Sequence, residues 1–195
     1  FVHAAPNLHV ARAAAEALWG FDKLPAERLA EAENFVRKDG AHCPDLVVHG
    51  QLIDLLGQLG EPVVVHTLIG LLADGRHMPG TSGEGFPLRF VATRAVVFQL
   101  LSHPEIRDTV SVEPFLEGAR HDDGRLAGPS LMALGLLGPR AHPHLPGVVR
   151  DHGDAADRAA LLLVASALAD PEGPPPPVEQ FAGPAHPSRA LISLT

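Results

Sequence analysis

Histidine is the residue type in this sequence with the clearest capacity for chemistry. The chain has twelve histidines in 195 residues, and imidazole is both a common metal ligand and a group that titrates near neutral pH. Three local groups bring possible donors together: His42-Cys43, His121-Asp122-Asp123 and His142-Pro143-His144. A structural zinc site needs four convergent ligands and a catalytic one three. Since no group has such a spacing, we predict neither a metal site nor a cofactor.

His66 differs from the other histidines because it lies in the middle of an apolar run over residues 63–72. A buried imidazole usually bonds to a backbone carbonyl, so a histidine of the core is the more ordinary interpretation. The alternative is that His66 faces a binding groove.

The longest interruption between apolar runs is the glycine-rich segment 74–87. It contains no GK[ST] or GxGxxG pattern, so it does not resemble a phosphate-binding loop. Long loops are often functional, and Arg76 and His77 are its candidate binding residues. A recognition loop and a tolerated insertion are equally compatible with this segment.

Hydrolytic chemistry has no support in the sequence. No serine lies in a G-x-S-x-G turn, and the single cysteine, Cys43, lacks a recognisable catalytic context. Whether the protein is an enzyme is therefore left open.

Charge and hydropathy narrow the range of partners. The formal charge of −8 disfavours nucleic acid, which is bound through clustered Lys and Arg. The longest apolar runs, such as 161–168, are far shorter than the roughly 20 residues of a membrane span. We therefore expect that the protein binds neither nucleic acid nor membrane. A single cysteine excludes an internal disulfide, which favours a cytoplasmic protein.

The hydrophobic pattern predicts pairs of helices joined by short turns. The first helices of the pairs are expected at 7–19, 45–59, 88–101, 125–137 and 154–169. The second helices are expected at 25–38, 62–73, 111–120 and 143–151, with a fifth at 177–183 made doubtful by the prolines at 174–177.

The first helices end at regularly spaced leucines: Leu18, Leu59, Leu101, Leu137 and Leu168. Subtracting neighbouring residue numbers gives spacings of 41, 42, 36 and 31, which are typical of helical repeats. Segments such as 46–59 and 90–101 are apolar on more than one face, and a stack of helix pairs covers both faces.

These features resemble the HEAT-repeat family, particularly its alanine-rich bacterial form. The resemblance is carried by two segments, Asp154-Ala155-Ala156-Asp157-Arg158 leading to Ala167-Leu168-Ala169-Asp170, and Arg125 leading to Ala133-Leu134-Gly135. It implies an all-α, right-handed superhelix of about five helix pairs. We expect one such domain over 1–195, either as a whole chain or as a fragment of a longer one, with an irregular Pro-rich end at 171–195.

In a HEAT-like stack the second helices line the concave surface. The resemblance therefore implies a row of binding residues formed by His66, Glu117, Arg120 and Arg150, and Arg89 is a further candidate. The expected function is a non-catalytic scaffold that presents this surface to a protein or peptide.

The alternative is a small-molecule-binding protein or a lyase-like enzyme on the same framework. DNA glycosylase activity, also found among HEAT-like proteins, is disfavoured by the negative charge and the single tryptophan, Trp19.

Overall fold

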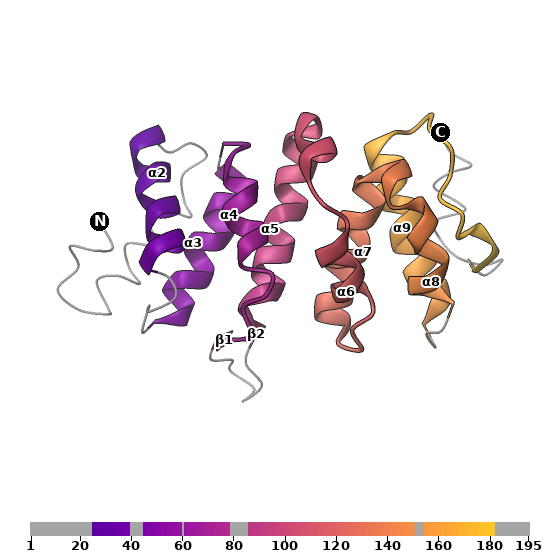
Figure 1. Cartoon of the computed structure of the whole chain (residues 1–195), viewed down its shortest axis with the longest axis horizontal. Coiled ribbons are helices and arrows are strands. Elements are labelled where there is room, and N and C mark those ends of the chain that lie inside the picture. Colours follow the sequence, from indigo (N-terminus) through magenta and orange to yellow (C-terminus); the bar gives the residue numbers. More distant parts are fainter. Residues whose placement is uncertain (1–24, 40–44, 60, 79–85, 151–153, 182–195) are drawn as a thin grey trace. The chain divides into compact units, whose positions relative to one another are not determined.

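The protein is helical throughout most of its described length. A computed structural model describes residues 25–39, 45–59, 61–78, 86–150 and 154–181 (Figure 1). Extended structure within these ranges is limited to one antiparallel pair, β1 (His77–Met78) and β2 (Phe86–Pro87). The predicted all-α class is confirmed. The exception is this short β1–β2 pair, which lies in the segment 74–87 that was expected to be a loop.

The chain forms two compact units, which we call unit 1 (1–99) and unit 2 (100–195). The division falls near the end of the helix α5 (Leu88–Ser102). The single continuous domain expected over 1–195 stays a prediction.

Unit 1 contains α2 (Ala26–Asn34), which continues into a π-helical turn (Phe35–Asp39), then α3 (Leu46–Leu59), α4 (Val64–Gly70) and most of α5. The Asp45 carboxylate caps the start of α3 by accepting hydrogen bonds from the Val47 and Val48 amides. The face of α3 toward the core carries Leu52, Ile53 and Leu56, each nearly inaccessible to solvent.

Helices α3 and α5 approach each other closely at Gly57. A Cβ built on Gly57 would lie 2.6 Å from both Cα and Cβ of Ala95, so only glycine allows this spacing. One turn after Ala95 on α5, the Gln99 amide donates to the Leu56 and Gly57 carbonyls at 3.1 Å. These carbonyls lie in the last turn of α3, where they have no partner within the helix.

Gly57→Ala is expected to lower the free energy of unfolding of unit 1 by about 1–3 kcal/mol, because the added methyl forces the two helices apart. Gly70→Ala is the matched control, since a Cβ at Gly70, the last residue of α4, meets nothing within 4 Å. The control should gain up to about 1 kcal/mol through helix propensity. Urea denaturation measures both, and a gain in both variants would contradict the close contact.

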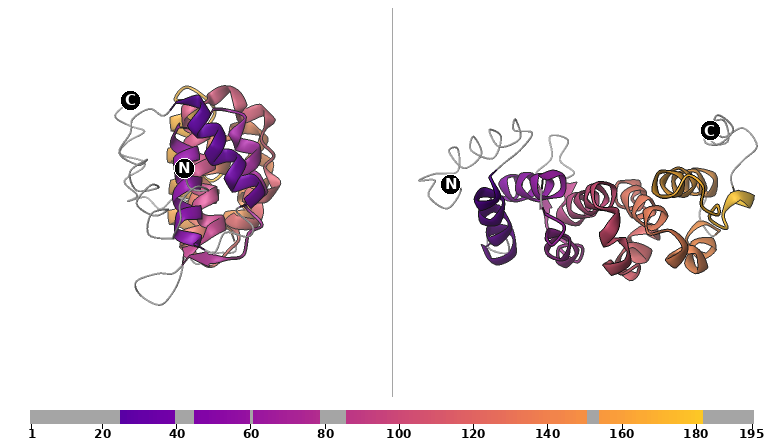
Figure 2. Two further views of the ribbon diagram at one scale, coloured as in Figure 1. Left: turned by 90° about the vertical axis from the view of Figure 1, so that its left-hand side faces the viewer. Right: turned by 90° about the horizontal axis from the view of Figure 1, so that it is seen from above.

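Unit 2 begins with a 3-10 turn (Pro104–Thr109), followed by α6 (Glu113–Ala119), α7 (Gly124–Leu136), two 3-10 turns (Gly138–Arg140 and His142–His144), α8 (Leu145–Val149) and α9 (Ala155–Ala169). Helices α7 and α9 lie side by side, while α6 packs on α7 and α8 on α9 (Figures 1 and 2). A Cβ on Gly135 would come within 2.5 Å of Ala165 Cβ, so α7 and α9 repeat the glycine contact of unit 1.

The buried Arg158 joins α9 to the end of α6. Its guanidinium donates to the carbonyls of Ala119 and His121, and its Nε donates to Asp154 at 2.6 Å. Asp154 stands at the N-cap position of α9, but its side chain caps no backbone amide. Asp123 makes such a cap on α7, by accepting from the Arg125 amide.

Four of the predicted first helices agree with α3, α5, α7 and α9 to within one residue at each end, and 7–19 lies outside the described residues. The second helix predicted at 25–38 agrees with α2 and its π-helical turn, whereas α4, α6 and α8 are shorter than the predicted second helices. Helix α4 covers part of 62–73, and α8 has five residues, with Pro146 and Gly147 inside it. In the described part of 177–183, which ends at residue 181, the helical structure is a 3-10 turn (Glu179–Phe181). The Pro-rich end predicted at 171–195 is irregular before that turn, and 182–195 lie outside the described residues.

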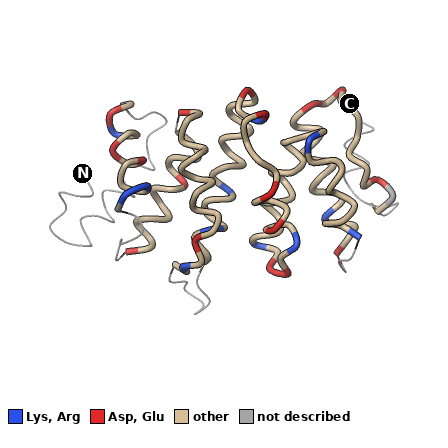
Figure 3. Tube along the Cα trace, in the orientation of Figure 1, with Lys and Arg blue, Asp and Glu red and all other residues tan. Residues whose placement is uncertain are grey.

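Charged side chains of both signs are interspersed along the described parts of both units (Figure 3). This distribution differs from the clustered Lys and Arg of a phosphate-binding surface. None of the described helices is both long and apolar enough to cross a membrane.

Candidate functional site

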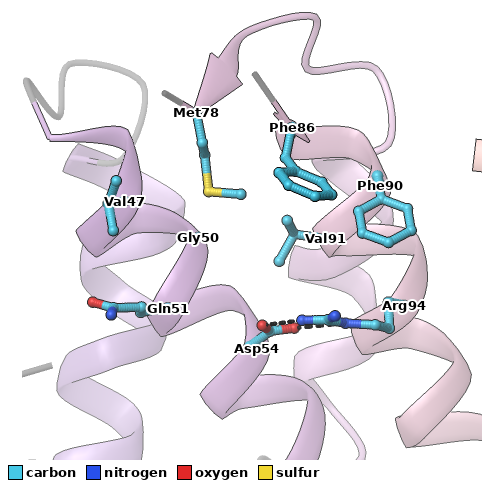
Figure 4. A pocket seen from close by; sticks show the side chains of 9 residues that line it. All are labelled: Val47, Gly50, Gln51, Asp54, Met78, Phe86, Phe90, Val91 and Arg94. Atoms are coloured by element: carbon cyan, nitrogen blue, oxygen red, sulfur yellow. Dashed lines mark hydrogen bonds and ion pairs between the residues drawn. The ribbon is translucent and has the colours of Figure 1, made fainter. Parts of the chain in front are cut away.

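A pocket of about 500 Å³ lies in unit 1 between α3, α5 and the β1–β2 pair (Figure 4). Its walls are predominantly apolar, with one ion pair and one amide. The lining residues are Val47, Gly50, Gln51, Asp54, Met78, Phe86, Phe90, Val91 and Arg94. Ligand pockets commonly have this size and composition, in which a few polar groups stand among apolar and aromatic side chains.

Helical and strand periodicity explain how these residues come together. On α3 the lining positions 47, 50, 51 and 54 follow the i, i+3, i+4, i+7 spacing of one helix face. On α5, Phe90 and Arg94 are one turn apart. Met78 and Phe86 are directly opposite in the antiparallel pair, so their side chains lie on the same face of it.

Gly50 makes room for Met78, which forms the roof of the pocket. A Cβ at this position would overlap Met78 Sδ, so the absence of a side chain on α3 lets Met78 lie against the helix backbone. Phe86 stands on the other side of the opening with 42% of its surface exposed, and its ring centroid is 5.9 Å from that of Phe90. The opening is thus framed by a thioether and two aromatic rings.

Asp54 of α3 and Arg94 of α5 form an ion pair in the pocket wall (Figure 4). Arg94 Nε donates to Oδ1 at 3.2 Å and Nη2 donates to Oδ2. The Asp54 side chain is 7% exposed and that of Arg94 is 41% exposed. Burial raises the pKa of the Asp54 carboxyl, and the Arg94 charge opposes this shift. Arg94 also lies 5.6 Å from the centroid of the Phe90 ring, within the range of a cation–π contact.

A second polar cluster fixes the segment that leads into β1. Arg76 is held by the Asp74 carboxylate, with Nη2 at 2.7 Å from Oδ2, and its Nη2 also lies 3.4 Å from His49 Nδ1. A guanidinium can only donate, so His49 Nδ1 accepts and the neutral ring carries its proton on Nε2. His49 is fully buried on α3, and its Nε2 has no hydrogen-bond partner among the described residues.

This environment opposes protonation of His49. Burial is the larger cause and the neighbouring Arg76 charge is the second, and together they lower the pKa of His49 to about 4. Protonation would also turn Nδ1 into a donor facing the donors of Arg76. The hydrogen bond between Arg76 and the neutral imidazole of His49 therefore helps to hold the start of the β1–β2 pair against α3.

The residues predicted as binding candidates lie outside the pocket lining. In unit 1, His66 is exposed on α4, so the interpretation as a core histidine is wrong. Arg76 is half-buried against Asp74, His77 is exposed in β1, and Arg89 is half-buried in the first turn of α5. Arg76 and His77 do adjoin Met78, which forms the roof.

In unit 2, Glu117 lies on α6 and Arg120 and Arg150 follow the ends of α6 and α8. All three are exposed. The row expected from these residues and His66 stays a prediction.

The pocket residues that the sequence predictions missed are chiefly Asp54 and Arg94. Both are charged side chains within long, predominantly apolar helical segments, and this contrast is the sequence signal that could have identified them. Their pairing across two helices 40 residues apart in sequence follows only from the packing of α3 on α5.

Among the described residues that line the pocket, none offers a hydroxyl, thiol, amine or imidazole group, which are the usual nucleophiles. The one carboxylate among these described lining residues, that of Asp54, accepts hydrogen bonds from Arg94. In the part of the chain that the structure describes, no three His, Cys, Asp or Glu side chains are grouped to hold a metal ion.

Comparison with known proteins adds no relative to this picture. No protein-family model, no curated protein and no solved structure matches the chain. The geometry of the pocket is therefore the basis for a functional conclusion.

Proposed function

We propose that this protein is a non-catalytic recognition module that binds a protein or peptide by taking one apolar side chain into the unit 1 pocket. The main support for this proposal is that Met78, Phe86 and Phe90 surround the opening of a predominantly apolar pocket of about 500 Å³. Aromatic and methionine side chains are enriched at interfaces, and deformable thioethers suit variable apolar partners.

The exposure of Phe86 favours a macromolecular partner. A large aromatic side chain with 42% of its surface in contact with water gains free energy when a partner covers it. A segment that places one side chain in the pocket would cover the Phe86 ring with its flanking residues. Such a central buried anchor with a surrounding rim is the usual organisation of an interface.

The proposal includes a HEAT-like repeat architecture for the helices. Its support is that each unit joins two long helices by the same device, a glycine against an alanine: Gly57 with Ala95 and Gly135 with Ala165. In each case a polar side chain of the second long helix also donates to a carbonyl near the end of the first, through Gln99 and Ser166. Recurrence of one packing device is expected of structural repeats.

Selection from a library of random twelve-residue peptides tests the recognition function. The enriched peptides are expected to share a large apolar residue, because only such a side chain matches the pocket walls. Val47→Trp, which fills the pocket from α3, should weaken their binding by about tenfold or more, as loss of an anchor contact does. Isothermal titration of the selected peptides measures the change.

Val63→Trp is the matched control, because Val63 does not line the pocket and is 63% exposed beside α4. It should leave affinity unchanged. A library that yields no enriched peptide, or peptides that bind the Val47→Trp variant as tightly as the unmodified protein, would overturn the proposal.

A small apolar molecule is the alternative occupant, and the pocket volume is the observation that favours it. It predicts that low-molecular-weight apolar compounds bind the pocket while no library peptide does.

A further inference from the structure

We infer that Arg94 donates a hydrogen bond to an uncharged carbonyl group of the ligand, next to the apolar side chain that enters the pocket. The pocket would therefore prefer a backbone amide to a carboxylate. The inference rests on the proposed function and names the chemistry that the same pocket recognises. It assigns Arg94 as a specificity-determining residue and Asp54 as the residue that positions it.

The hydrogen bonds of Arg94 leave one side of its guanidinium available. Nε and Nη2 donate to Asp54, whereas Nη1 has no hydrogen-bond or ion-pair partner among the described residues. The side chain is 41% exposed and lines the pocket. A ligand acceptor can therefore reach Nη1 without displacing Asp54.

Asp54 decides which acceptor is preferred. The Asp54–Arg94 pair has no net charge, so an arriving carboxylate finds a donor whose positive charge is already compensated and a second carboxylate close by. A neutral carbonyl gives up less hydration on entering the apolar pocket than a carboxylate does. The paired arginine thus acts as an oriented donor for a neutral group rather than as a site for an anion.

The position of this donor fits a peptide. Arg94 is flanked by Phe90 and Val91 on α5, so an apolar side chain resting on these residues would place its own backbone carbonyl near the guanidinium. Apolar contact and one backbone hydrogen bond would then be made by the same residue of the partner.

Three probes with one apolar body and different heads separate the contributions: propylbenzene, N-methyl-3-phenylpropanamide and 3-phenylpropanoate. Dissociation constants measured by ligand-observed NMR on the full chain are expected to show the amide binding roughly twofold to tenfold more tightly than the carboxylate, the range of one net hydrogen bond. Arg94→Met should remove the preference for the amide while leaving propylbenzene affinity within about twofold.

Asp54→Asn gives the sharper result. Without the neutralising carboxylate, the Arg94 charge becomes available and the preference should invert in favour of 3-phenylpropanoate. Arg125→Met is the control, since it breaks an Arg–Asp pair that does not line the pocket, and it should leave the preference unchanged. Melting curves show whether each variant is folded.

The outcomes distinguish the two claims. Binding of propylbenzene with no amide preference, or with a preference that Arg94→Met and Asp54→Asn leave unchanged, would overturn the role of Arg94 while the apolar pocket stands. If none of the three probes binds, the pocket does not accept apolar groups, and the proposed function fails together with the inference.

Discussion

Replacing Arg158 by methionine is expected to lower the free energy of unfolding of unit 2 by about 2–4 kcal/mol. Methionine keeps the apolar part of the buried side chain but donates no hydrogen bond. The carbonyls of Ala119 and His121 then lose the donor that reaches them from α9. Urea denaturation measures the loss, and hydrogen exchange at the C-terminal turn of α6 should rise locally.

Arg125→Met provides the comparison within the same unit. Arg125 is also paired with an aspartate, Asp123, but its side chain is 40% exposed, and exposed ion pairs contribute less than about 1 kcal/mol. Equal losses in the two variants would show that the buried hydrogen bonds of Arg158 do not stabilise the contact between α6 and α9.

Acidification from pH 7 to pH 4 is expected to destabilise unit 1 by about 3 kcal/mol through His49 alone. The pKa of His49 is lowered from 6.5 to about 4 in the folded state, and each pKa unit corresponds to 1.36 kcal/mol. Above pH 6.5 the ring is neutral in both the folded and the unfolded state, so its titration does not reduce the stability of unit 1. Between pH 6.5 and 4 only the unfolded chain takes up the proton, so stability falls as the pH falls.

His49→Asn isolates this effect, because an amide oxygen can accept from Arg76 without titrating. The stability of the variant, measured by urea denaturation at several pH values, should depend much less on pH in this window. His142 in unit 2 also has a pKa lowered by burial, so the difference between variant and unmodified protein is the relevant quantity. Parallel pH curves would mean that His49 is readily protonated in the folded state.

The helices were predictable because their apolar periodicity is strong and their ends carry turn residues. The limits of α3 and α9 were close to the prediction, since both are long segments that remain apolar on several faces. Helix α4 was overestimated because its turns at both ends are rich in apolar residues that propensity alone assigns to the helix. Local sequence thus determines which segments are helical better than it determines where they stop.

The two histidines in apolar helices show why burial was harder to predict. His66 was expected in the core because valines surround it, yet Val63 and His66 are both exposed and lie three positions apart on one face of α4. His49 is the buried histidine, on a helix covered from more than one side. Periodicity identifies the faces of a helix, but which of them is covered depends on its neighbours.

The pocket could not be derived from local patterns because its walls come from three separate segments. Met78 and Phe86 face it only through the pairing of β1 with β2, and Asp54 meets Arg94 only because α3 and α5 lie side by side. Attention to charged residues in apolar helices would have included Asp54 and Arg94 among the candidates, although it would not have revealed the cavity between them.

The internal pairing of Asp54 with Arg94 has a kinetic consequence. Because this ion pair carries no net charge, it adds little long-range attraction for an approaching ligand. For the uncharged ligand proposed above, association would then proceed without electrostatic steering, in the range of about 10⁵–10⁶ M⁻¹ s⁻¹, and would depend little on ionic strength. Differences in affinity among partners would consequently arise from how long each complex survives rather than from how quickly it forms.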